Sequence, residues 1–124
     1  MTAKPRLLRL DHVQIAVPSG AEAECRAYWG GLLGLAEIPK PAGLAGRGGL
    51  WFRLGEAEIH LGVEVAFRPA KKAHPAFIAA DIAALAQRLQ KAGRAVLWDD
   101  AIAGRRRFFT EDPVGNRIEF IGAQ

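Results

Sequence analysis

The sequence predicts an α+β fold that consists of two tandem βαβββ modules. A strand pattern, followed by a helix pattern and three short strand patterns, occurs twice along the 124 residues. Corresponding residues recur at similar offsets, since His12 lies 62 residues before His74 and His60 lies 59 residues before Glu119. Neither half can bury both faces of its sheet alone, so two halves must pair, within one chain or between chains.

The first module begins with a strand predicted over 10–17, where apolar and polar side chains alternate as a half-buried strand requires. Ser19 and Glu22 then have the spacing of a capping box, which predicts the start of a helix. Apolar residues recur at helical spacing from there to Gly34, whose lack of a side chain suits the C-terminal end. Cys25 therefore lies on the buried stripe of this helix.

A segment rich in proline and glycine, residues 39–49, follows a short strand predicted over 35–38. It lacks the Lys-Ser/Thr pair of a Walker phosphate loop, so we interpret it as a mobile flap. Two strands then form a hairpin over 50–54 and 57–65, because the two residues between them suit a tight turn.

The second module repeats this order after a linker over 68–72. A strand is predicted over 74–80, and Asp81 caps a helix that ends at Gly93. Three further strands are expected over 95–98, 105–111 and 117–122, the last two joined by a turn over 112–116. We expect a single domain over 1–124, with module one at about 8–66 and module two at about 73–122.

Composition excludes several classes of protein. A single cysteine rules out an internal disulfide and a cysteine-rich zinc site, and it favours a reduced, cytoplasmic setting. We find no signal-peptide core and no run of about 20 apolar residues, so no membrane association is expected. The net charge of +4 is spread among interspersed acids, which favours a pocket for an anionic small molecule, or a solvated surface, over nucleic-acid binding.

Four side chains that can bind a metal occupy equivalent positions in the two halves. His12 corresponds to His74, and His60 to Glu119, each in the phase opposite the core-facing residues of its strand. We expect all four to converge on one concave face. Three imidazoles and one carboxylate suit Zn, Ni, Mn, Fe or Co, with coordination positions left open for substrate or water. His60 is the weakest candidate, since Glu58 shares its face and would suit an exposed position.

Four motifs carry a resemblance to a known family, and together they span essentially the whole chain. They are LDHVQIAV at 10–17, Tyr28-Trp29 with Leu33-Gly34-Leu35, HPAF at 74–77, and FFTEDPVGNRIEF at 108–120, of which the last is the most specific. The chain resembles the vicinal oxygen chelate superfamily, also called glyoxalase/bleomycin resistance/dioxygenase proteins.

The resemblance implies a fold whose curled mixed sheets surround a metal-binding cavity. Carried over by position, the metal ligands are His12, His60, His74 and Glu119, which hold a divalent transition metal (Zn, Ni, Mn, Fe or Co). Many members of the superfamily are homodimers whose modules share a site between chains, so a homodimer is expected. The metal of such proteins stabilises an oxyanion that develops on a small-molecule substrate.

One departure from glyoxalase I affects the expected chemistry. That enzyme has glutamate at the position of His60, so Glu119 is here the only carboxylate among the four and the candidate catalytic base. An isomerase or lyase reaction of the glyoxalase type remains the first hypothesis. Three arginines are candidates to bind an anionic group of the substrate, with surface solvation as the other interpretation: Arg53, Arg105 and Arg107.

Two alternatives stay open. A thiol transferase of the fosfomycin resistance type needs only two histidines and one glutamate, which His12, His74 and Glu119 supply. A non-catalytic drug-binding protein of the bleomycin resistance type would sequester a cationic ligand, which a chain with net charge +4 suits poorly.

Overall fold

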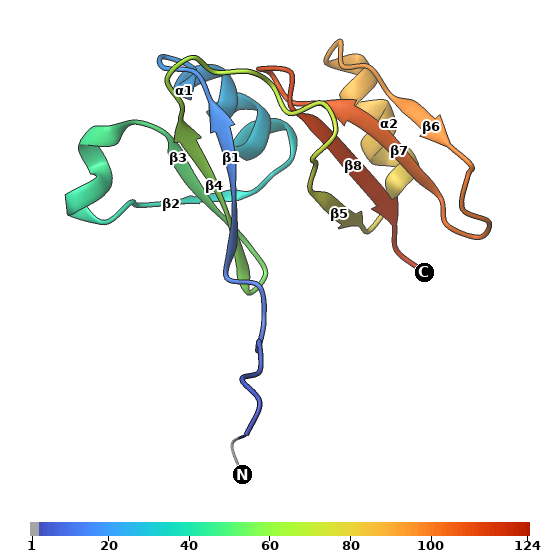
Figure 1. The fold of residues 1–124 in the computed structure, drawn as a ribbon. Coiled ribbons are helices and arrows are strands. Elements are labelled where there is room, and N and C mark those ends of the chain that lie inside the picture. Colours follow the sequence, from blue (N-terminus) through green and yellow to red (C-terminus); the bar gives the residue numbers. More distant parts are fainter. Residues whose placement is uncertain (1–2) are drawn as a thin grey trace.

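The computed structural model describes residues 3–124, which form two four-stranded sheets side by side, one for each module (Figure 1). The first sheet has the strand order β1-β4-β3-β2 and the second the equivalent order β5-β8-β7-β6. In each sheet the first and last strands of the module run parallel, whereas the other pairs are antiparallel. The fold is therefore α+β, with two tandem βαβββ modules and no closed barrel.

The elements follow in the predicted order. Module one contains β1 (His12–Val17), α1 (Glu22–Cys25), the π-helix η1 (Arg26–Leu32), β2 (Ala36–Ile38), the 3₁₀-helix η2 (Ala42–Arg47), β3 (Leu50–Leu54) and β4 (Ala57–Val63). Module two contains β5 (Ala76–Ala79), α2 (Ile82–Lys91), β6 (Leu97–Asp99), β7 (Arg107–Glu111) and β8 (Arg117–Gly122). Within residues 3–124, no helix is both long and apolar enough to span a membrane.

His74 lies two residues before β5, not inside a strand as the sequence analysis predicted. Pro75 explains the shorter strand, because proline has no N–H to donate to a ladder. The Pro75 carbonyl still accepts a hydrogen bond from the Glu119 N–H at 3.1 Å. This bond keeps the segment that carries His74 against β8.

The capping box predicted at Ser19 is wrong. Helix α1 begins at Glu22, after Ala21, and has no side-chain cap. Gly20 has a φ of +83°, which is incompatible with the first turn of a helix that starts at Ser19. The Glu22 carboxylate instead accepts a hydrogen bond from the Gly49 N–H at 3.4 Å.

The predicted flap also differs from expectation, since residues 42–47 form η2. Lys40 Nζ donates a hydrogen bond to the Gly48 carbonyl and so ties the two ends of this helix together. Gly49 has a φ of +83°, and a Cβ atom there would overlap the carbonyl oxygen of Leu61. The close approach to β4 therefore requires glycine at this position.

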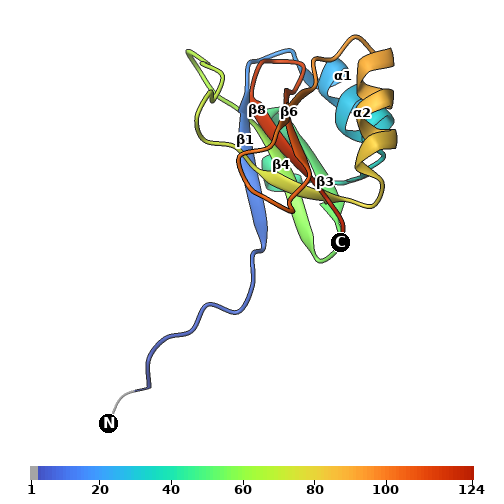
Figure 2. The ribbon, with the colours of Figure 1, turned by 90° about the vertical axis from the view of Figure 1, so that its right-hand side faces the viewer.

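A shared core joins the modules on the side of the sheets where the helices lie (Figure 2). Trp29, which is fully buried in η1, meets Phe77 of β5 edge to face at 5.9 Å. Arg88 of α2 donates a hydrogen bond from Nε to the carbonyl of Leu32 at 2.8 Å. The helices thus cover one face of each sheet and leave the opposite faces uncovered.

A second junction lies at the turn between β7 and β8. Asn116, which is buried, donates from Nδ2 to the Ala16 carbonyl of β1 at 2.8 Å and to Asp112 Oδ2 at 3.0 Å. Its Oδ1 accepts a hydrogen bond from the Ala70 N–H at 2.9 Å. One side chain of module two therefore holds both the linker and the first strand of module one.

Candidate metal-binding half-sites

The uncovered sheet faces carry the four candidate ligands. In sheet one, β1 pairs with β4 so that Gln14 is opposite His60, and His12 lies two residues earlier on the same face. In sheet two, β5 pairs with β8 so that Ala76 is opposite Glu119, and His74 precedes Ala76 by two residues. The corresponding pairs thus occupy matching places in the two modules.

The pair in module one is held by stacking. The His60 ring lies between the Trp51 ring, at a centroid distance of 3.8 Å, and the His12 ring, at 4.1 Å. His60 Nε2 is 2.9 Å from Glu58 Oε1, and only 4% of the residue is exposed. Glu58 therefore does not mark an exposed position, because it is the hydrogen-bond partner that orients a buried imidazole.

His12 is oriented by its neighbour in the chain. Its Nδ1 lies 2.8 Å from Asp11 Oδ2. The hydrogen bond from His12 is the main reason why the pKa of Asp11 lies below its usual value. Since a carboxylate only accepts, Nδ1 carries the proton, and Nε2 of the neutral ring keeps the lone pair that a metal would bind.

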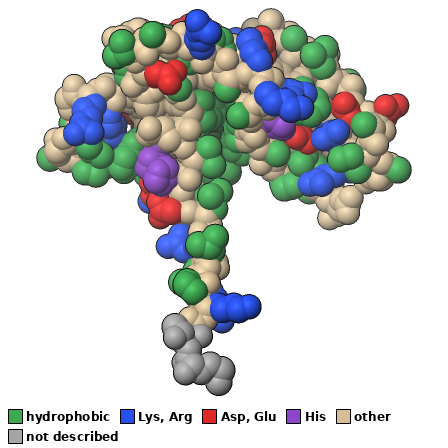
Figure 3. Space-filling view, in the orientation of Figure 1, with side chains coloured by type: hydrophobic (Ala, Val, Ile, Leu, Met, Phe, Trp, Pro, Cys, Tyr) green, Lys and Arg blue, Asp and Glu red, His purple; other side chains and the backbone are tan. Residues whose placement is uncertain are grey.

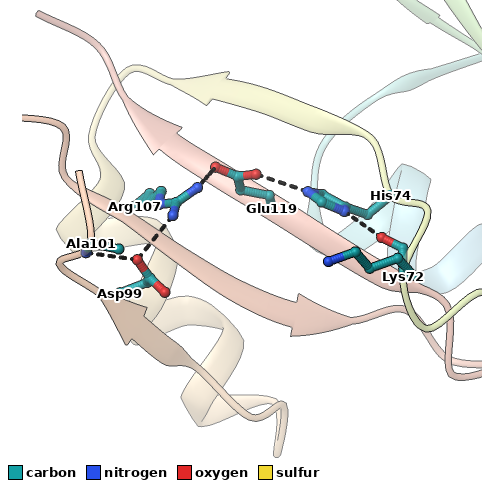
Figure 4. Close-up of polar contacts among 6 residues, drawn as sticks. All are labelled: Lys72, His74, Asp99, Ala101, Arg107 and Glu119. Carbon is teal, nitrogen blue, oxygen red and sulfur yellow. Dashed lines mark hydrogen bonds and ion pairs between the residues drawn. The ribbon is translucent and has the colours of Figure 1, made fainter.

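The pair in module two has a polar arrangement that points to a cation (Figure 4). His74 Nδ1 lies 2.9 Å from the Lys72 carbonyl, and its Nε2 lies 3.0 Å from Glu119 Oε1. The carbonyl and the carboxylate can only accept, so in this structure each ring nitrogen donates a hydrogen bond to one of them. When the proton on Nε2 is released, an imidazole nitrogen and a carboxylate oxygen lie 3.0 Å apart as neighbouring donor atoms for a metal ion. The donor set therefore fits a divalent metal.

Glu119 is ionised at neutral pH although it is buried. Burial alone would raise its pKa, but the hydrogen bonds with His74 and Arg107 outweigh this effect and bring the pKa below its usual value. Arg107 Nη1 donates to Glu119 Oε2 at 3.1 Å, which leaves Oε1 directed at His74. The carboxylate is thus in the form that binds metals.

The three arginines predicted to bind substrate have different surroundings. Arg107 bridges two carboxylates, because its Nη2 also donates to Asp99 Oδ1 at 3.0 Å. The hydrogen bond to Glu119 is the main cause of its raised pKa. Arg53 lies 3.9 Å from Glu58 Oε2, and Arg105 is exposed in the loop between β6 and β7. Only Arg105 is free of a carboxylate partner among these three, within the described residues.

The two ligand pairs lie on separate modules. Among residues 3–124, no three histidine, cysteine, aspartate or glutamate side chains are close enough together to hold a metal ion. The space-filling view places the histidines as two separate patches on the two halves of the molecule (Figure 3). A single chain thus brings the four predicted ligands together as two pairs, not as one cluster.

Sequence reasoning missed several residues beside these pairs. Trp51 is opposite His60 in the β3–β4 ladder, a position that the predicted hairpin register would have identified. Arg117 lies two residues before Glu119 and hence on the same sheet face; its guanidinium carbon is 4.0 Å from the centre of the Phe109 ring. The alternation of the last strand, predicted over 117–122, contained this signal.

Comparisons with known proteins were made at the level of family, sequence and structure. A scan against models of protein families returned no match, and neither did a search among curated proteins. Among solved structures, the chain is similar to a protein from Bacillus anthracis described as a glyoxalase family protein, with 48% sequence identity and a TM-score of 0.93. The alignment covers 98% of this chain and 100% of that one. The chain belongs to the glyoxalase family.

This member of the glyoxalase family has the fold of the vicinal oxygen chelate superfamily, as the sequence motifs indicated. The chain is also similar to lactoylglutathione lyase from Agrobacterium tumefaciens, with 18% identity, a TM-score of 0.71 and coverage of 97% and 96% of the two chains. The antibiotic binding protein TnmS3 from Streptomyces sp. CB03234 has 17% identity, a TM-score of 0.76 and coverage of 98% and 100%. A lyase and a binding protein thus share this fold, so the fold alone does not decide the function.

Proposed function

We propose that the protein is a metal-dependent enzyme that performs glyoxalase-like isomerase or lyase chemistry on a small molecule. The contact between His74 Nε2 and Glu119 Oε1 carries this proposal, because it places two atom types that bind metals, an imidazole nitrogen and a carboxylate oxygen, 3.0 Å apart on an uncovered sheet face. The stacked and hydrogen-bonded pair His12 and His60 offers the complementary donors. The metal is a divalent transition ion, such as Zn, Ni, Mn, Fe or Co.

The site is completed by a second copy of the chain. Each chain carries one pair of ligands on each module, and the pairs do not meet within residues 3–124. In a symmetric dimer, His12 and His60 of one copy would join the partner's His74 and the partner's Glu119, and the same contact would occur twice. This arrangement uses every candidate ligand and leaves no pair exposed on its own.

When bound, the metal would act as a Lewis acid on adjacent oxygens of the substrate. The residues of the chain supply the remaining chemistry. Glu119, kept ionised by hydrogen bonds that include the one from Arg107, is the candidate base that would accept a proton from a substrate carbon. Arg107 donates a hydrogen bond to Oε2 and so orients the carboxylate. Trp51 lines the opposite half-site and helps to exclude water from it.

Metal analysis of the purified protein tests the proposal. We expect about one divalent ion per chain by inductively coupled plasma mass spectrometry, and loss of that ion in His12→Ala, His60→Ala, His74→Ala and Glu119→Gln. Glu111→Gln is the matched control, because it also removes one carboxylate from module two but lies outside the pair. If the wild-type protein binds no divalent metal at micromolar concentration, the proposal is wrong.

A further inference from the structure

A cavity of about 480 Å³ lies beside the half-site of module two, between β1 and the linker that leads to β5. Its wall includes His74 and Arg117 from module two, Arg68 from the linker and Gln14 from β1. Glu64 is the only acidic residue among the lining residues. In the space-filling view, lysine and arginine side chains gather around the histidine of this half of the molecule (Figure 3). The cavity therefore combines a candidate metal ligand with excess positive charge.

Arg117 is held in place by an aromatic ring. Its guanidinium lies above the face of Phe109 at 4.0 Å, and the ring of His74 meets Phe109 edge to face at 5.5 Å. The aromatic contact fixes the plane of the guanidinium, while its N–H groups at the edge stay available. Both Arg117 and His74 therefore flank one ring, and both line the cavity.

No carboxylate within residues 3–124 forms an ion pair with Arg117. Its cross-strand neighbour Glu111 instead accepts a hydrogen bond from Lys71 Nζ at 2.7 Å. The other two carboxylates of this sheet face, Glu119 and Asp99, are both bound to Arg107. All three carboxylates thus have cationic partners already, and within the described residues Arg117 makes no ion pair of its own.

We propose that Arg117 binds an oxyanion group of the substrate, a carboxylate or a phosphate, in the cavity beside His74. A planar guanidinium with its edge exposed matches two oxygens of such a group. The assignment to a substrate rests on the proposed function, whereas anion binding at Arg117 can be measured without a metal. Arg107, one of the three candidates from the sequence, positions Glu119 and does not provide the anion site.

The test is a titration of the full-length protein, treated with a chelator to remove metal, with inorganic phosphate and separately with acetate. Backbone amide chemical shifts report binding, and we expect those of Asn116, Arg117 and Gln14 to move together in at least one titration. Arg117→Gln should weaken binding about tenfold or more, since a charge-assisted pair is lost. Arg117→Lys should recover part of the affinity, because it keeps the charge but not the planar fork.

Arg47→Gln is the matched control, because it removes the same charge from an exposed position in η2, away from the cavity. Its affinity should stay within about twofold of the wild type. The relative affinities of phosphate and acetate identify which oxyanion the site prefers. The proposal is overturned if neither probe moves these amides, or if Arg117→Gln binds as the wild type does, or if Arg47→Gln weakens binding equally.

The same variants separate this proposal from the proposed function. Arg117→Gln should keep its metal content, since Arg117 is not among the four ligands. Phosphate binding without any metal binding in the wild type would contradict the enzyme function and leave the anion site standing. Metal binding in the wild type, together with an unchanged affinity of Arg117→Gln for phosphate and acetate, would contradict the anion site and leave the enzyme function standing.

Discussion

His60 illustrates what single residues contribute and what a sequence can reveal about them. Its phase on the strand was visible in the sequence, but its burial was not, because burial depends on the Trp51 ring from the neighbouring strand. Glu58, two residues earlier, suggested an exposed position and proved to be the partner that orients the imidazole. The candidate ligands were thus predictable from alternation, whereas the groups that hold them depend on contacts between strands.

The role of Trp51, whose ring stacks on His60, can be tested by substitution. Trp51→Ala removes one side of the stack, so the imidazole gains freedom and metal affinity should fall about tenfold or more, as for other groups that orient ligands. Competition with a chromophoric chelator measures the change. Trp51→Phe keeps an aromatic surface and should lie close to the wild type. Equal metal affinity in Trp51→Ala would contradict the orienting role.

At the scale of elements, predictions succeeded where a local rule decides the structure. Asp81 caps α2 and accepts a hydrogen bond from the Ala84 N–H at 3.0 Å, as its residue type suggested. The start of α1 was missed because Gly20 adopts a positive φ, which the spacing of Ser19 and Glu22 does not reveal. The helix η2 inside the predicted flap was missed, because composition does not encode local contacts such as the hydrogen bond from Lys40 to the Gly48 carbonyl.

The turn between β7 and β8 joins the modules through the hydrogen bonds of Asn116, and a substitution there tests this role. Asn116→Ala removes three hydrogen bonds and leaves the Ala16 carbonyl and the Ala70 N–H without their partner. We expect the free energy of unfolding to fall by about 2–4 kcal/mol, measured by urea denaturation. Gln124→Ala serves as the control, because its amide makes one exposed hydrogen bond to the Gly104 carbonyl. A change below about 0.5 kcal/mol in Asn116→Ala would show that the turn does not join the modules.

For the whole molecule, the internal repeat predicted the fold class and the equivalence of the two ligand pairs. The repeat could not predict which two modules bring their uncovered faces together. Equivalent modules can pair within one chain or between two chains, and the sequence pattern is the same in both cases. The expected convergence of four ligands on one face is therefore not found within a single chain. The helices of the two modules share a core instead, which directs the ligand pairs to separate halves.

A hybrid dimer tests the arrangement proposed for the complete site. One chain carries His12→Ala with His60→Ala, the other carries His74→Ala with Glu119→Gln, and two affinity tags isolate the mixed dimer. If ligand pairs from different copies join, one of the two sites is intact, so about one metal ion per hybrid dimer is expected. Dimers of either double variant alone should bind none. A hybrid without metal would exclude sites shared between copies.

The separation of the ligand pairs has a consequence for how the protein behaves on dilution. If each ion is held by two chains, metal binding and association are linked, so that metal tightens the dimer and the dimer tightens the metal. The apparent metal affinity then depends on the protein's own concentration, and it falls once the chains are dilute enough to part. The abundance of the chain would thus set whether its metal stays bound, without any separate regulatory site.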